Sequence, residues 1–141
     1  MPHDMVIGDA SREAGVKPAT IRYYESIGLL PAPSRTVGNR RTYLDQDVQR
    51  LKFIRHAREL GVEVAAIRQL LALAGSPQSP CEGADAIARA HLIGIEDKIA
   101  RLTALRRELK AMIQHCSNGT ISECRVIEVV ADHTHCLADA H

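Results

Sequence analysis

The stretch from about residue 84 to residue 115 constrains the fold most. It contains no proline, and mostly apolar residues recur in it every three or four positions, which is the spacing of one face of a helix. A helix of about 30 residues is roughly 45 Å long, so it cannot bury such a stripe by itself. We therefore predict that it pairs with the same helix of a second copy, antiparallel or parallel, as a coiled coil in a homodimer. The stripe, with Lys98 as a polar break, comprises Ala88, His91, Ile95, Lys98, Leu102, Leu105, Leu109 and Met112.

The length of 141 residues allows one compact domain and one long helix, but not two domains with separate large cores. The chain has one Phe and no Trp, and its aliphatic residues recur at helical rather than alternating spacing. We therefore expect a mainly α fold, without a large ligand-binding domain of the kind that a drug sensor needs.

The N-terminal half predicts a helix, a turn and a second helix. Residues 7–14 suit a short helix, which Gly15 and Val16 break. Pro18 suits the first turn of a second helix at about residues 19–27, and Gly28 can close it in the left-handed conformation. Two helices joined in this way over about 20 residues are typical of a DNA-reading motif.

Residues 34–43 predict a hairpin, or wing, because a Gly-Asn turn signal lies between two short runs. Helices should follow at about 47–60 and 64–74. The inner side of the first should carry Val48, Leu51, Phe53, Ile54 and Ala57. The predicted parts are a winged helix-turn-helix domain (1–75), a Gly- and Pro-rich linker (76–83), a dimerisation helix (84–115), a loop with a short helix (116–128) and a flexible tail (129–141).

Cationic side chains cluster in the first half, although the net charge is only +1. Residues 1–75 hold 11 Lys and Arg against 8 Asp and Glu. Arginine can bind guanine bidentately, whereas Thr and Tyr more often fix the register on the phosphate backbone. The candidate DNA contacts are Thr20, Arg22, Tyr23 and Tyr24 of the second helix, Arg35, Arg40, Arg41 and Tyr43 of the wing, and Arg55 and Arg58 of the next helix.

Three of the four cysteines flank the long helix. Cys81 lies just before it, Cys116 lies just after it, and seven residues separate Cys116 from Cys124. One chain cannot easily bring the two ends of this helix together, but two antiparallel chains can. Cys81 of one subunit would then meet the 116–124 loop of the other, and thiolates select soft or borderline ions such as Zn, Cd, Pb, Hg and Cu(I).

Several motifs lie in this order along the chain: Ile7-Gly8, Thr20-Ile21-Arg22-Tyr23-Tyr24-Glu25, Gly28-Leu29-Leu30, Arg41-Thr42-Tyr43 and Leu51-Lys52-Phe53-Ile54-Arg55. Together they resemble the MerR family of transcriptional regulators over about residues 5–128. The resemblance implies a dimer whose heads straddle an overlong promoter spacer and distort the DNA so that RNA polymerase can engage both promoter elements. It also implies control of metal efflux or resistance genes. Arg40 stands where family members usually have an aromatic residue.

The same resemblance bears on the metal. A cysteine at the position of Cys81 marks family members that sense divalent ions, which favours Zn, Cd, Pb or Hg as the effector. The seven-residue loop is common among Cu(I) sensors, so a Cu(I)-responsive regulator remains the alternative, as does a redox-sensing regulator. A fourth ligand could be water, Glu82, His115 or a tail group, and the additional candidates in the tail are His133, His135 and Cys136.

The sequence gives little support for an enzyme, a membrane protein or a secreted protein. There is no His-Glu-x-x-His pattern and no glycine-rich phosphate loop, so we expect no enzyme activity. No stretch is apolar enough to span a bilayer, and the first residues lack the features of a signal peptide. We therefore expect a cytoplasmic protein without a membrane partner.

Overall fold

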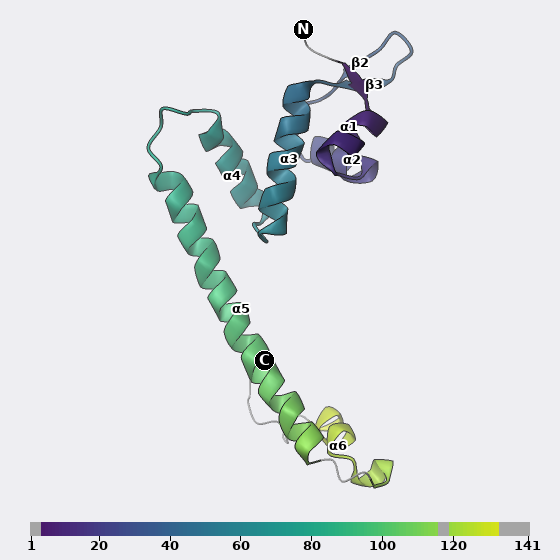
Figure 1. Ribbon diagram of the computed structural model, residues 1–141, viewed down its shortest axis with the longest axis vertical. Helices are drawn as coiled ribbons and strands as arrows, with labels where there is room; N and C mark the ends of the chain where they lie inside the picture. The colour runs from purple at the N-terminus through teal and green to yellow at the C-terminus, as the bar shows by residue number, and fades with distance from the viewer. Residues whose placement is uncertain (1–3, 116–118, 133–141) are drawn as a thin grey trace. The chain divides into compact units, whose positions relative to one another are not determined.

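The computed structural model describes residues 4–115 and 119–132 (Figure 1). The chain divides into two compact units, Met1–Ala84 and Asp85–His141, which are described separately. We call the described part of the first unit the head. Its elements are β1 (Met5–Val6), α1 (Ile7–Ala14), α2 (Pro18–Ser26), β2 (Ser34–Arg35), β3 (Arg41–Tyr43), α3 (Asp45–Glu59) and α4 (Val64–Ala74).

The helices of the head match the sequence prediction closely. Helices α1 and α4 have the predicted bounds, and α2 begins and ends one residue earlier than predicted. Helix α3 begins two residues early at Asp45, and the Asp47 carboxylate accepts a hydrogen bond of 2.9 Å from the Leu44 amide. Gly28 adopts a φ of 75°, which confirms the predicted left-handed turn after α2.

The sheet of the head has three antiparallel strands in the order β1-β3-β2. The predicted hairpin is present, with Arg35 opposite Arg41 and Ser34 opposite Thr42. Strand β1 was not predicted; it places Met5 opposite Tyr43 on the other side of β3. The wing is therefore the middle and one edge of a sheet that begins at the start of the chain.

The core of the head lies between α1, α2, α3 and α4, where α3 packs beside α1 and α4 (Figure 1). The buried residues of α3 recur every three residues, so one side of this helix faces the core. Phe53 is a correction, because it is 37% exposed and lies off that side. The largest fully buried aliphatic residues are Ile21, Leu29, Leu30, Val48, Leu51, Ile54 and Ile67.

The second unit is dominated by α5 (Glu82–Gln114), whose first residues belong to the head. It has 33 residues and is therefore about 50 Å long. It starts two residues before the predicted position, and a 3-10 turn (Ile121–Glu123) and α6 (Arg125–Ala131) follow it. None of the helices within the described ranges is long and apolar enough to cross a bilayer.

The apolar stripe of α5 differs in part from the predicted one. Met112 and the neighbouring Glu108 are buried, so the chain itself covers that side of the last turns. The exposed side instead carries apolar residues at seven-residue repeats, which is the spacing of a coiled-coil seam. This exposed stripe consists of Leu92, Ile99, Leu102, Leu109 and Ile113, with the half-buried Ile95 between the first two.

Candidate DNA interface and metal ligands

Helices α1 and α2 and the turn between them fix the predicted reading helix. Gly15 ends α1 with a φ of 70°, and its amide donates to the Ser11 carbonyl at 2.9 Å. A Cβ at Gly15 would overlap the guanidinium of Arg55, so no side chain fits there without displacing it. Pro18 occupies the first turn of α2, where no amide is needed.

The predicted DNA contacts on α2 divide into exposed and buried groups. Arg22 and Tyr23 are exposed, and the Tyr23 side chain is 53% accessible. Thr20 is half-buried, whereas Tyr24 is buried with Ile21 on the opposite side of the helix. Arg22 and Tyr23 therefore present free polar groups, and Tyr24 contributes to the core.

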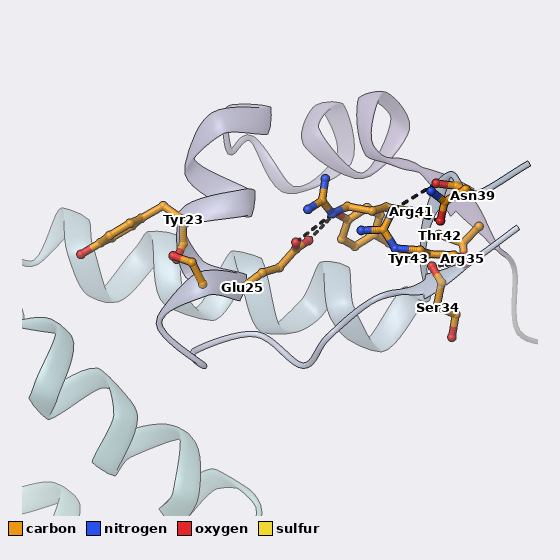
Figure 2. A network of polar contacts seen from close by, with 9 residues as sticks. Tyr23, Glu25, Ser34, Arg35, Asn39, Arg41, Thr42 and Tyr43 are labelled. Atoms are coloured by element: carbon orange, nitrogen blue, oxygen red, sulfur yellow. Dashed lines mark hydrogen bonds and ion pairs between the residues drawn. The ribbon is translucent and has the colours of Figure 1, made fainter.

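Hydrogen bonds across the turn of the wing stabilise its conformation. The Thr36 amide donates to the Arg40 carbonyl at 2.8 Å, and Asn39 adopts a φ of 64°, which asparagine tolerates better than most residues. The Arg35 guanidinium donates to the Asn39 carbonyl at 3.0 Å (Figure 2). The exposed Arg40 is thus displayed at the end of a closed turn.

Tyr43 is a correction to the predicted set, because its ring is fully buried. Its hydroxyl donates to the Glu25 carboxylate of α2 (Figure 2). Burial, followed by the contact with Glu25, raises the pKa of Tyr43 far above its usual value, so the phenol stays protonated. The structure therefore assigns Tyr43 a packing and hydrogen-bonding role inside the head.

A groove of about 320 Å³ opens between the start of α1, helix α2 and the wing. Among its described lining residues there is no Asp or Glu. Val6, at the N-cap of α1, offers no side-chain hydrogen bond to the first amides of that helix. Cationic side chains and helix N-terminal amides both favour anions, so the groove suits a phosphate. Its charged lining residues are Arg22, Arg35, Arg40 and Arg41.

The two predicted contacts on α3 are engaged within the head. Arg58 donates to the Val62 carbonyl at 3.0 Å and so closes the turn between α3 and α4. Arg55 is half-buried beside Gly15, and its Nη2 lies 3.0 Å from Nε2 of His56. Contacts of these two arginines with DNA stay predictions.

Three further polar residues were missed by the sequence reasoning. Arg50 donates to the Leu29 carbonyl at 2.8 Å, and Arg68 of α4 donates to the Ile27 carbonyl at 2.7 Å. Both arginines thereby hold the segment that follows α2. Glu25 accepts from Tyr43 and also pairs with Arg41. The arginine contacts join residues more than 20 positions apart, for which the sequence carries no local signal.

The predicted metal ligands fall partly within the described residues. Cys81 is exposed in the turn before α5, and Cys124 is half-buried at the N-cap of α6. Cys116 and the tail candidates His133, His135 and Cys136 lie outside the described residues. Within residues 4–115 and 119–132, no three His, Cys, Asp or Glu side chains form a cluster that could hold a metal ion.

The donor chemistry nevertheless fits a soft ion. Thiolate sulfur is the preferred ligand of soft and borderline metals. Among the candidates for a fourth ligand, Glu82 and His115 are both exposed. Nδ1 of His115 lies 2.7 Å from the Ala111 carbonyl and donates to it, so Nε2 of the neutral ring keeps its lone pair for another partner.

Comparison with known proteins places this arrangement in a family. Residues 5–74 match the family described as "MerR HTH family regulatory protein", and residues 48–112 match "MerR, DNA binding". Heavy metal-dependent transcription regulator 2 of Rhizobium meliloti is 41% identical over 128 residues, which cover 91% of this chain and 87% of that protein.

Two solved structures resemble the chain over most of its length. The transcription regulator PbrR691 from Ralstonia metallidurans in complex with lead(II) has a TM-score of 0.78 and 38% identity, covering 89% of this chain and 98% of that one. The regulator MerR from Bacillus megaterium in complex with mercury(II) has a TM-score of 0.67 and 30% identity, covering 90% and 99%. The chain therefore belongs to the MerR HTH family of regulatory proteins, and it is a transcription regulator rather than an enzyme.

Proposed function

We propose that the protein is a dimeric, metal-responsive regulator that binds promoter DNA through its head. In this proposal a divalent soft ion (Zn, Cd, Pb or Hg) binds at Cys81, Cys116 and Cys124. Metal binding then changes how the two heads hold the promoter, so that the distorted DNA allows RNA polymerase to start transcription. The regulated genes would serve metal efflux or resistance.

The groove of the head supports the DNA-binding part of the proposal. It gathers four arginines beside the exposed face of α2. Such a group can neutralise phosphates, and Arg22, an exposed residue of α2 that lines the groove, would reach a base edge from the same side. Tyr23, exposed on the same helix, can add a contact to the backbone.

The surface of α5 supports the dimer. Its exposed stripe would remain in water in a single chain, and a second copy of the same helix would cover it. The charges also favour antiparallel pairing. Residues 82–98 hold four acidic and two basic side chains, whereas residues 99–114 hold four basic and one acidic. Two antiparallel copies therefore bring opposite charges together along both halves.

The metal part rests on the relatives and on the cysteines. The observation that carries it is 38% identity, over 89% of this chain, to a regulator solved with lead(II). A second relative of similar coverage holds mercury(II). Both are soft divalent ions that thiolates bind tightly, and metal binding would release the thiol protons. The seven-residue spacing of Cys116 and Cys124 keeps a Cu(I) sensor as the alternative, and a redox sensor would use the same sulfur atoms.

The decisive experiment titrates the reduced dimer with each metal while promoter transcription is measured. Cys81→Ser should abolish the response to Zn, Cd, Pb and Hg and leave promoter binding intact, because the arginine groove is untouched. Ser79→Ala is the matched control, and it should keep the response because Ser79 is an exposed residue near Cys81 that carries no thiolate. Zinc or cadmium activation that survives in Cys81→Ser would contradict the divalent site, and a Cu(I) response alone would favour the alternative.

A further inference from the structure

Glu25 is an unexpected residue beside a groove that attracts anions. It lies on α2, three residues after Arg22, and its side chain is only 8% exposed. A carboxylate repels phosphate and loses hydration when it is buried, so it needs compensating partners. Those partners show what this residue contributes.

Both oxygens of the Glu25 carboxylate contact the same strand of the wing. The Tyr43 hydroxyl donates to Oε1, and Nε of Arg41 lies 3.2 Å from Oε2 (Figure 2). Arg41 and Tyr43 are two positions apart on β3, so their side chains point to the same face of the strand. One carboxylate therefore attaches this strand to α2 at two points.

The other parts of the wing, strand β2 and the turn, are hydrogen-bonded to each other and to β3 and should move together with it. Strand β2 pairs with it, and the Thr42 hydroxyl donates to the Ser34 carbonyl at 3.1 Å. Arg35, opposite Arg41, holds the turn through the Asn39 carbonyl. A displacement of β3 relative to α2 would therefore carry the turn and its arginines with it.

The hydrogen bond from Tyr43 to Glu25 should not depend on the ionisation of the tyrosine at physiological pH. The raised pKa of Tyr43 keeps its hydroxyl protonated and donating. On the other side, the Arg41 side chain is 34% exposed and also lines the groove. Arg41 can therefore face the groove while it pairs with Glu25.

We infer that Glu25 is a positioning residue that fixes the wing against α2, so that the wing arginines and Arg22 meet DNA in one register. The inference rests on the proposed DNA-binding function. Glu25 itself would not touch DNA in this arrangement. It acts through Arg41 and Tyr43, and its replacement should alter where the wing lies rather than remove a DNA ligand.

The test compares Glu25→Gln with Glu13→Gln in the full-length dimer, using a preferred duplex selected from a random library. Glu13 is an exposed residue of α1, so both changes remove one negative charge from the head. On charge alone, both should raise affinity for random duplex, because each makes the head more positive. Only Glu25→Gln should lower affinity for the selected duplex, by about tenfold, as expected for coupled neighbouring residues.

Hydroxyl-radical footprints of the same complexes supply a readout that a general loss of stability would not give. In the complex with the Glu25→Gln variant, the DNA backbone should lose protection from cleavage where the wing lies and keep it where α2 lies. Unchanged affinity and an unchanged footprint relative to Glu13→Gln would overturn the inference. If the wild-type dimer itself preferred no duplex over random DNA, the proposed function would fail instead.

A second variant, Tyr43→Phe, tests the same contact if Glu25→Gln unfolds the head. Tyr43→Phe removes only the hydroxyl that donates to Glu25 and should shift the same part of the footprint. Where Glu25→Gln does fold, the double variant Glu25→Gln/Tyr43→Phe should lose less affinity than the sum of the two single losses, because both changes break one shared attachment. Strict additivity, with both proteins folded, would show that Tyr43 and Glu25 act separately.

Discussion

The head and the long helix differ in how much of their apolar surface is buried within one chain. In the head, four helices and a small sheet enclose a core whose largest residues, such as Leu51 and Ile54, have no exposed surface. Along α5, by contrast, Leu102 is 64% exposed and Leu109 is 56% exposed. The head is therefore complete as a single chain, whereas α5 has the surface of a helix that is completed by association.

This difference separates two kinds of stability. The core of the head should unfold with a free energy that does not depend on protein concentration. The pairing of α5 should follow mass action, because a second molecule supplies the missing contacts. Substitutions in the two regions can therefore be told apart by their dependence on concentration.

The largest effect is expected in the core of the head. Ile54→Ala should lower the free energy of unfolding of the head by about 2–5 kcal/mol, because it leaves a cavity among buried side chains. Urea unfolding at two protein concentrations measures this loss, which should be the same at both. Ile93→Ala is the matched control, since Ile93 is 69% exposed and lies off the stripe. An equal loss in both variants would remove the distinction between the two regions.

A smaller effect is expected for the exposed stripe. Leu102→Ala removes apolar area from each helix of the dimer, worth about 1–3 kcal/mol per buried leucine, and should raise the dimer dissociation constant at least tenfold. Analytical ultracentrifugation measures the constant, while the unfolding of the head should not change. Leu60→Ala, at a 70% exposed position of the head, provides the control. An unchanged dissociation constant would place the dimer contact on another surface.

The smallest effect is expected at Gly94, in the middle of α5. Nothing lies within 4 Å of a Cβ added there, so alanine fits the single chain. Gly94→Ala should therefore stabilise the helix by about 0.5–1 kcal/mol, since alanine has the better helix propensity. A rise in the midpoint of thermal unfolding of the dimer would report it. A weaker dimer would instead mean that the backbone of the second copy approaches this glycine.

Much of the fold could be predicted because its helices are long enough to show periodicity and have clear end signals. Helix α1 and helix α4 were predicted to the residue, and Pro18 and Gly28 marked the limits of α2 to within one residue. Strand β1 was missed because two residues carry no period. Phe53 was placed inward because it neighbours Ile54, although adjacent residues lie about 100° apart around a helix.

The candidate site could be predicted less well. A tyrosine in a strand faces either the core or solvent depending on register, and the pairing with β1 that fixes Tyr43 was not visible. The role of Glu25 depends on contacts with a strand some 16 positions away, for which spacing gives no signal. The cysteine ligands stay a prediction, which the metal titrations test directly.

The pairing of β1 with β3 also has a consequence for the order of assembly. Met5 and Tyr43 are neighbours in the sheet, although both helices of the reading motif lie between them in sequence. During synthesis on the ribosome, the sheet cannot close before Tyr43 has emerged, and closing so long a loop costs entropy that local helices do not lose. Helices α1 and α2 can therefore form from local contacts before the sheet closes, whereas β1 acquires its partner strand only after both helices have been synthesised.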